Sequence, residues 1–217
     1  MRIRHHALQM AAHREDDLTL SRSDLADDPF EQFDAWWDYA ADKVPMPEAI
    51  CLSTVDAQGM PDARMVLLRG HGPDGFRIYT NYDSNKAAQL DGQGVAALCL
   101  FWRELDRQVR IRGTVKRATA EESDAYYLSR PPLHRLGAWA SPQSQPIENR
   151  DELERRLAEV EERFAGEEDV PRPENWGGYV LEPDVIEFWQ GRIGRLHDRF
   201  TYTPDGSGGW TIQRLGP

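Results

Sequence analysis

The chain has 217 residues, of which 40% are hydrophobic and 29% are charged, and its 26 basic and 37 acidic side chains give a net charge of −11. This composition is typical of a soluble globular protein, and the acidic balance argues against general nucleic-acid binding. No run reaches the roughly 18 apolar residues of a membrane span, and the opening "MRIRHHALQM" lacks the apolar core of a secretion signal.

Residues 1–27 are polar and show no sustained period, so we expect a mobile N-terminal arm. A helix is predicted next, with Asp28 as N-cap and Pro29 at its first position. Its apolar stripe at helical spacing consists of Phe30, Phe33, Trp37 and Ala40.

Short strands dominate the rest of the chain. They are predicted over residues 49–56, 63–70, 76–81, 95–102, 107–118, 177–183, 185–191, 195–203 and 209–215. Further helices are predicted over 84–90, 119–130 and 150–165. Many strands joined by short turns predict a mainly β fold with flanking helices, an antiparallel sheet closed into a barrel, within one domain over residues 28–217.

The segment 128–147, "LSRPPLHRLGAWASPQSQPI", has no clear period and is predicted to be a functional loop. Cys51 and Cys99 lie in apolar runs, which indicates buried free thiols and a reducing, cytoplasmic compartment. The histidines show no metal-binding spacing, so we expect no metal site.

Basic residues gather in "RLHDRF", against the acidic trend of the chain. In a strand, Arg195, His197 and Arg199 would share one face, where a guanidinium fork and an imidazole suit an anion. A solvated strand face explains the same pattern, and both interpretations stay open for this stretch taken alone.

Two further stretches have the same character. Arg64 and Arg69 bracket the apolar strand "ARMVLLRG", although strand-end arginines also simply meet solvent. In "YTNYDSNK", hydroxyl groups precede a helix that carries Lys86 in its first turn, an arrangement suited to phosphate, although Ser84 is equally a helix cap. Together the clusters predict a β-rich protein whose ligand bears phosphate.

These stretches, in this order, resemble the pyridoxamine 5′-phosphate oxidase family. The matching pieces are "RMVLLR", "YTNYDSNK", "RQVRIRG", "YYLSRP", "GAWASPQSQPI", "WGGY", "IEFWQG" and "RLHDRF", within roughly residues 24 to 217. The resemblance implies a split-barrel homodimer with FMN at the subunit interface. It also implies oxidation of pyridoxine or pyridoxamine 5′-phosphate to pyridoxal 5′-phosphate, with oxygen as acceptor and hydrogen peroxide as product.

The resemblance also assigns residues by position. For FMN it implies Arg64, Met65, Val66, Leu67, Tyr79, Thr80, Asn85, Lys86, Gln108, Gln143, Ser144, Trp189 and Arg199. For the phosphorylated substrate it implies Arg69, Tyr126, Arg130, His134, Arg195 and His197. Arg195 and His197 would lie beside the pyridine ring, where they would position and polarise it.

Four departures from the family pattern bear on these assignments. Arg69 replaces a usual lysine, and Asn85 stands where an arginine usually precedes Lys86. His134 and Arg135 replace a serine and a glutamine, and the arm lacks the family's Arg-x-x-Tyr lid. Because most of these changes touch the substrate side, two alternatives stay open: a related flavin oxidase acting on another ring, of the phenazine type, and a non-catalytic protein that binds FMN or pyridoxal phosphate. An interaction barrel without a ligand is a further alternative.

Overall fold

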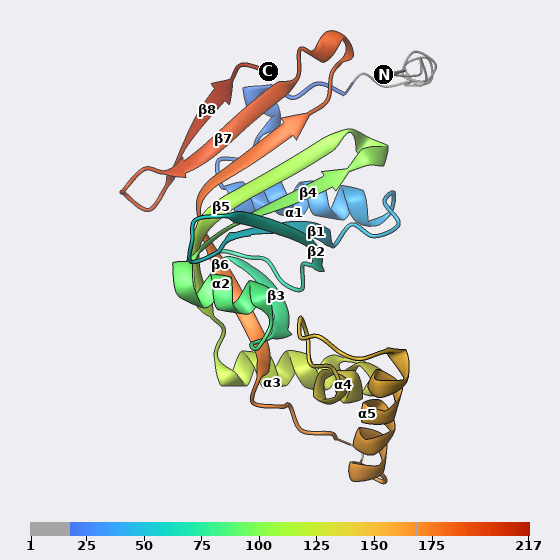
Figure 1. Ribbon diagram of the computed structural model, residues 1–217. Coiled ribbons are helices and arrows are strands. Elements are labelled where there is room, and N and C mark those ends of the chain that lie inside the picture. The colour runs from blue at the N-terminus through green and yellow to red at the C-terminus, as the bar shows by residue number, and fades with distance from the viewer. Residues whose placement is uncertain (1–17, 168) are drawn as a thin grey trace, which may run out of the picture. The chain divides into compact units, whose positions relative to one another are not determined.

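The computed structural model describes residues 18–167 and 169–217 (Figure 1). The chain folds into two compact units. Among the described residues, the first comprises 18–47, 99–111 and 184–217, and the second comprises 48–98, 112–167 and 169–183. Within the described ranges, no helix is long and apolar enough to cross a membrane.

In the described part of the chain, eight strands form one mainly antiparallel sheet, as the strand-and-turn pattern predicts. They are β1 (Ala49–Val55), β2 (Pro61–Leu67), β3 (Phe76–Asn81), β4 (Val95–Trp102), β5 (Arg107–Arg117), β6 (Trp176–Gln190), β7 (Asp198–Pro204) and β8 (Trp210–Leu215). Their order is β2-β1-β4-β5-β6-β7-β8, and β3 pairs with β6 beside that path. The predicted hairpins β1–β2 and β7–β8 are both antiparallel pairs.

The strand prediction is wrong in two places. The predicted strands 177–183 and 185–191 form one strand, β6, that passes through Pro183. Pro183 lies between the residues of β6 that pair with β3, which end at Leu181, and those that pair with β7, which begin at Ile186, so the strand changes one of its partners around the proline. The strand predicted over 195–203 begins only at Asp198, since Gly194 and Arg195 have positive φ angles of 74° and 64°.

The first unit is built on α1 (Pro29–Ala41), which is capped as predicted: the Asp28 carboxylate accepts from the N–H groups of Phe30 and Glu31. The helix buries Phe33, Ala40 and, in place of the half-buried Trp37, Trp36. The Trp36 ring meets Phe188 of β6 edge to face at 5.2 Å. Aromatic packing of this kind is a large apolar contribution to a core.

The arm predicted over residues 1–27 lies outside the described residues as far as residue 17. Its described part contacts β7. Leu20 and Leu25 are buried, the Leu20 N–H donates to Asp198 Oδ2 at 3.1 Å, and the Tyr202 hydroxyl donates to the Ala26 carbonyl at 2.8 Å.

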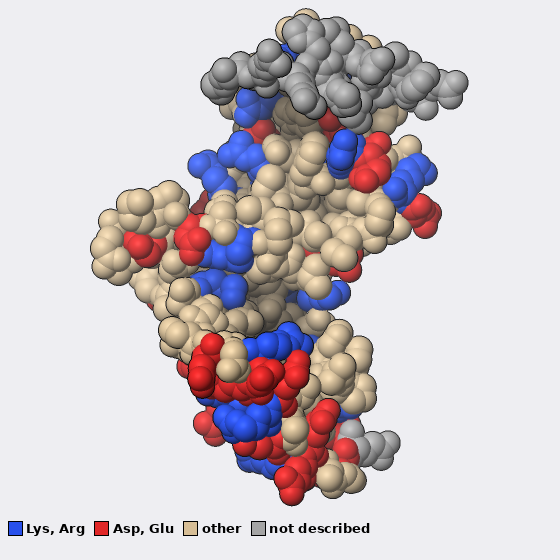
Figure 2. All heavy atoms as spheres, turned by 45° about the vertical axis from the view of Figure 1, so that its right-hand side comes forward, with Lys and Arg blue, Asp and Glu red and all other residues tan. Residues whose placement is uncertain are grey.

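The second unit carries four helices among its described residues. They are α2 (Asn85–Gln93), α3 (Ala120–Ser129), α4 (Pro132–Ala140) and α5 (Arg150–Arg163). Ser84 caps α2, and Gly94 ends it in the left-handed conformation. The predicted capping box of α3 is present between Thr119 and Glu122. On the surface of α5, acidic and basic side chains are interspersed (Figure 2). Three ion pairs there join side chains that lie four residues apart in the helix.

The predicted loop 128–147 is partly helical, because α4 occupies residues 132–140. Proline suits the first turn of a helix, since its N–H has no partner there and its φ angle is already helical. Helix α4 therefore begins at Pro132, with Pro131 at the N-cap position, and only the remainder of the segment is a loop. Elsewhere, Cys51 and Cys99 are half-buried, whereas the sequence predicted buried thiols.

Candidate active site

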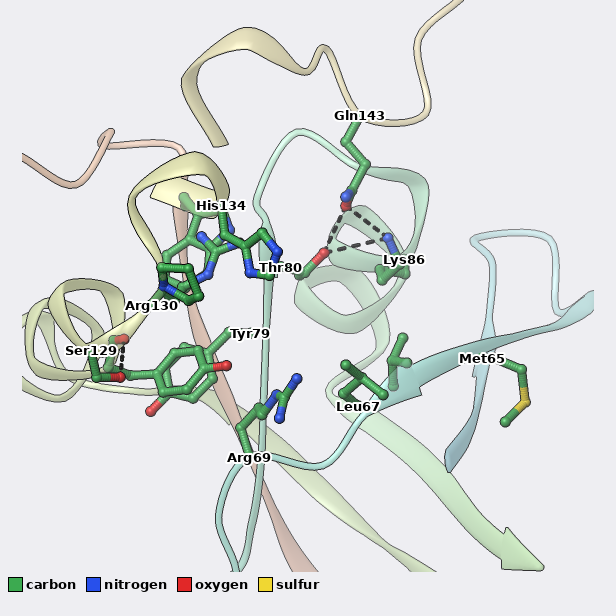
Figure 3. A pocket seen from close by; sticks show the side chains of 14 residues that line it. Met65, Leu67, Arg69, Tyr79, Thr80, Lys86, Ser129, Arg130, His134 and Gln143 are labelled. Atoms are coloured by element: carbon green, nitrogen blue, oxygen red, sulfur yellow. Dashed lines mark hydrogen bonds between the residues drawn. The ribbon is translucent and has the colours of Figure 1, made fainter. Parts of the chain in front are cut away.

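A pocket of about 640 Å³ opens in the second unit (Figure 3). Its walls come from β2, the connection to β3, β3 itself, α2, α3, α4, the loop after α4 and the first residue of β6. The lining residues are Met65, Val66, Leu67, Arg69, Tyr79, Thr80, Lys86, Tyr126, Ser129, Arg130, Pro131, His134, Gln143 and Trp176.

The lining of the pocket is cationic. Arg69, Lys86 and Arg130 face it, and none of the described residues that line it is acidic. This contrasts with the net charge of −11 of the whole chain. Charged groups of one sign in a low-dielectric cleft focus the field on a ligand of the opposite sign, so the pocket suits an anion.

Lys86 lies at the start of α2 and reaches two polar groups. Its ammonium donates to Gln143 Oε1 at 2.9 Å and lies 3.4 Å from Thr80 Oγ1. Burial lowers the pKa of Lys86, and the nearby Arg64 lowers it further. Within the described ranges no carboxylate pairs with this ammonium, so its charge is available to a ligand.

Thr80 donates to the same Gln143 oxygen at 2.8 Å (Figure 3). An ammonium can only donate, which identifies the atom of Gln143 that faces Lys86 as oxygen. Two donors, from β3 and α2, therefore converge on one acceptor. A ligand oxygen placed there would receive the same two hydrogen bonds.

Arg64, predicted to contact FMN, does not line the pocket. Its guanidinium donates to Thr54 Oγ1 at 2.6 Å and to Gln89 Oε1 at 3.0 Å, and it pairs with Asp62 at 2.5 Å. These partners hold Arg64 beside Lys86, where its charge adds to the positive potential.

The opposite end of the pocket is aromatic. Tyr79 stacks on Tyr126 with ring centroids 3.9 Å apart and planes 21° apart, and Trp176 lies nearly parallel to both rings. Burial raises the pKa of Tyr79, so its hydroxyl keeps its proton and can donate. Gly178 permits this packing, since a Cβ there would lie 2.8 Å from the Tyr79 ring.

Arg130 ends α3 and lies at this aromatic end. Its Nη1 atom is buried and has no hydrogen-bond partner among the described residues. Burial lowers the pKa of Arg130, and the charge of Arg69 contributes in the same direction. A buried guanidinium N–H without an acceptor is costly, and an anionic ligand oxygen would satisfy it.

His134 reaches the pocket from the first turn of α4. The loop that follows α4 returns to the pocket at Gln143, whereas Ser144 is exposed, with a φ angle of 66°. Asn85, beside Lys86, is exposed and does not line the pocket.

The other predicted site residues belong to the first unit. His197 lies against Trp189 with ring centroids 4.6 Å apart, and its Nδ1 accepts the N–H of Arg192 at 3.0 Å. Arg199 donates through Nε to Glu187 at 2.8 Å. Arg195 is exposed and lies in η4 (Ile193–Arg195), so the shared strand face expected for Arg195, His197 and Arg199 does not exist.

The predicted site residues therefore fall into three groups. Those that the pocket brings together are Met65, Val66, Leu67, Arg69, Tyr79, Thr80, Lys86, Tyr126, Arg130, His134 and Gln143. Those of the same unit that do not line it are Arg64, Asn85 and Ser144. Those of the first unit are Gln108, Trp189, Arg195, His197 and Arg199.

Sequence reasoning missed three lining residues: Ser129, Pro131 and Trp176. Each lies within a stretch that carries the family resemblance, "YYLSRP" or "WGGY", and that position in the sequence was the available sign of their proximity.

The chain matches family models over most of its length. Residues 38–164 match the model described as pyridoxamine 5′-phosphate oxidase, and residues 176–217 match the pyridoxine 5′-phosphate oxidase C-terminal dimerisation region. The chain belongs to the pyridoxamine 5′-phosphate oxidase family. The resemblance seen in the sequence is thereby confirmed.

Individual relatives agree with this placement. The chain is 54% identical over 200 residues to the pyridoxine/pyridoxamine 5′-phosphate oxidase of Bordetella petrii, covering 92% of this chain and 94% of the relative. It is 49% identical to the enzyme of the same name from Salinibacter ruber, with coverages of 91% and 93%.

Solved structures confirm the predicted fold class. PhzG from Burkholderia lata 383, in complex with tetrahydrophenazine-1-carboxylic acid, aligns with a TM-score of 0.85 at 28% identity, covering 93% of this chain and 98% of that one. An FMN-binding protein from Nostoc punctiforme, related to pyridoxamine 5′-phosphate oxidase, aligns at 0.70 and 19% identity, covering 89% and 100%.

Proposed function

We propose that the protein is an FMN-dependent oxidase of pyridoxine 5′-phosphate and pyridoxamine 5′-phosphate that forms pyridoxal 5′-phosphate. Oxygen is the electron acceptor and hydrogen peroxide the second product. The observation that carries the proposal is the pocket of a family member lined by three cations, one of which, Arg130, has a buried Nη1 without a hydrogen-bond partner among the described residues.

The donor set at one end of the pocket fits FMN. The oxygen of Gln143 already receives hydrogen bonds from Thr80 and Lys86, so these groups are arranged to hold an oxygen acceptor of the cofactor. Met65 to Leu67 would contact the cofactor along β2, and the nearby charge of Arg64 would add to the positive potential at Lys86. FMN, when bound, would take a hydride from the substrate carbon and pass the electrons to oxygen.

The other end of the pocket suits the substrate phosphate. Arg130 offers the buried Nη1, Arg69 adds a second guanidinium, and Tyr126 offers a hydroxyl. Arginine forks match phosphate oxygens in geometry and charge. His134 lies at the same end and would add a further donor to the phosphate.

Arg195 and His197 would act at the pyridine ring. Because Nδ1 of His197 accepts the Arg192 N–H, the neutral imidazole carries its proton on Nε2, which therefore donates. Contact with Trp189 fixes the plane of the imidazole. His197 would thus present a fixed N–H donor to the substrate, while Arg195 would polarise the ring.

Homodimer formation is part of this proposal. Residues 176–217 match a dimerisation region, and this stretch contains Trp189, Arg195, His197 and Arg199. An FMN site shared between two subunits would account for proposed site residues that lie outside the pocket of the second unit. Cys51 and Cys99 form no disulfide among the described residues and fit a reducing compartment, so we place the reaction in the cytoplasm.

A related oxidase acting on another ring is the second candidate, and the similarity to PhzG at a TM-score of 0.85 favours it. A ring without phosphate would leave the buried Nη1 of Arg130 without an acceptor. This consequence is the reason for ranking it second.

An anaerobic titration tests the proposal. FMN-loaded protein receives pyridoxine 5′-phosphate while the visible absorbance of the flavin is followed. We expect bleaching that recovers when oxygen is admitted, with hydrogen peroxide formed in equal amount. A flavin that stays yellow with both phosphorylated substrates would refute the oxidase. Bleaching only by non-phosphorylated rings would move the function to the second candidate.

A further inference from the structure

Trp176 is the first residue of β6 and lines the pocket, yet nothing in the proposed catalytic set includes it. Only 6% of its surface is exposed. Its ring lies 5.7 Å from that of Tyr79 and 6.2 Å from that of Tyr126, with planes 13° and 9° apart. It is therefore held on one side by a rigid aromatic stack.

Trp176 also supports Arg130. The guanidinium carbon of Arg130 lies 4.7 Å from the centre of the Trp176 ring, within the range of a cation–π contact. The ring of Tyr127 lies 5.8 Å from the same carbon and edge-on to Trp176. Two aromatic faces thus contact a guanidinium that forms no ion pair within the described part of the chain.

The nature of this support matters for ligand binding. A carboxylate beside Arg130 would neutralise it and occupy its N–H groups, so a phosphate would have to compete with it. An aromatic face attracts the cation through the ring's quadrupole and occupies none of the N–H groups. Arg130 is therefore held in place while its buried Nη1 keeps its hydrogen-bonding capacity.

We propose that Trp176 is a positioning residue for recognition of the substrate's phosphate, and that it acts through Arg130. The identity of the ligand as a phosphate monoester rests on the proposed function. The contact itself is independent of the oxidase chemistry and applies to any phosphate bound by Arg130.

The test compares Trp176→Leu, which keeps an apolar side chain and removes the aromatic face, with Trp176→Phe, which keeps a smaller face. Trp36→Leu is the matched control, because Trp36 is also buried and lies under Arg107 at 4.4 Å, but does not line the pocket. Calorimetry on the dimeric, FMN-loaded protein measures binding of pyridoxal 5′-phosphate, pyridoxal and inorganic phosphate.

We expect Trp176→Leu to weaken the binding of pyridoxal 5′-phosphate and of inorganic phosphate by about tenfold, because a desolvated cation–π contact is lost. The affinity of this variant for pyridoxal should lie within twofold of that of the unchanged protein. Trp176→Phe should recover most of the phosphate affinity, and Trp36→Leu should change neither. In turnover the same loss should raise KM and leave kcat within twofold.

A double-mutant cycle with Arg130→Ala identifies the route of the effect. If Trp176 acts through Arg130, the double variant binds phosphate no more weakly than Arg130→Ala alone. Additive losses, or equal losses for pyridoxal and pyridoxal 5′-phosphate, would overturn the inference. Should Trp176→Leu not fold, the cycle is run with Trp176→Phe, for which we expect a smaller but equally non-additive loss.

The outcomes separate this inference from the proposed function. If the protein does not oxidise pyridoxine 5′-phosphate but Trp176→Leu weakens its binding of inorganic phosphate, the oxidase proposal fails and the role of Trp176 stands. If the protein oxidises the substrate and Trp176→Leu leaves its KM unchanged, the oxidase proposal stands and the role of Trp176 fails.

Discussion

Gln143 offers a sharp perturbation of the cationic pocket. Its amide oxygen lies 2.9 Å from the Lys86 ammonium and 2.8 Å from Thr80 Oγ1. Gln143→Glu changes one amide to a carboxylate of the same shape, and both hydrogen bonds can still form. The variant therefore adds one negative charge at a known place and changes almost nothing else.

The size of the effect follows from Coulomb's law. A carboxylate about 5 Å from a phosphate repels it by about 1 kcal/mol per unit charge at a dielectric constant near 80, and by about 3 kcal/mol near 20. The pocket is open to solvent, so the true value lies between these limits. Binding of FMN should weaken by about five- to 150-fold.

Fluorescence titration of the apoprotein with FMN and with riboflavin measures this effect. Riboflavin lacks the phosphate, so its affinity should fall much less on Gln143→Glu. Gln143→Met, similar in size and uncharged, controls for loss of the hydrogen bonds. In about 1 M salt the Debye length is about 3 Å, and the extra loss for FMN should shrink. Equal losses for FMN and riboflavin, or a loss that salt does not change, would refute an anion site at Lys86.

Three further predictions concern the same unit. Burial and Arg64 lower the pKa of Lys86, so FMN binding should weaken as pH rises through that lowered pKa, which lies below the usual lysine value of about 10.4. Lys86→Arg should remove this alkaline loss of affinity, as a series of titrations at different pH would show. Gly178→Ala should lower the free energy of unfolding by about 1–3 kcal/mol and displace Tyr79, whereas Gly137→Ala in α4, with open space around its Cβ, should be neutral or stabilising; chemical denaturation distinguishes the two. Thr119→Ala, which removes the cap of α3, should cost about 1 kcal/mol in the same assay, and an unchanged midpoint would contradict the capping role.

Local patterns were enough to predict most elements. Asp28 followed by Pro29 marked the start of α1, and the Thr119–Glu122 spacing marked α3, because a cap satisfies the N–H groups of the next few residues only. Alternating apolar residues and short turns likewise predicted the strands. The stretches that resemble the family predicted most of the pocket-lining residues, because a family motif is recognised from residue identity alone.

Where the prediction failed, the deciding contacts were distant in sequence. Pro183 looks like a strand break, but β6 continues through it because it is paired with β5, with β3 before the proline and with β7 after it. Helix α4 has no long apolar period, and it is anchored by contacts such as the Tyr127 hydroxyl on the Arg135 carbonyl at 2.8 Å. Arg195 adopts a positive φ angle that no local pattern announced.

The sequence by itself determined the family, the β-rich fold and the residues able to bind phosphate, because these depend on residue type and short spacing. Tertiary structure alone decided which cations are free to act. Arg64 and Arg130 are both arginines beside apolar strands or helices in the sequence. One has its guanidinium held by Asp62, Thr54 and Gln89, and the other rests on Trp176 with a buried N–H unsatisfied. That difference arises from neighbours brought together by folding, and it sets which side chain has charge left for a ligand.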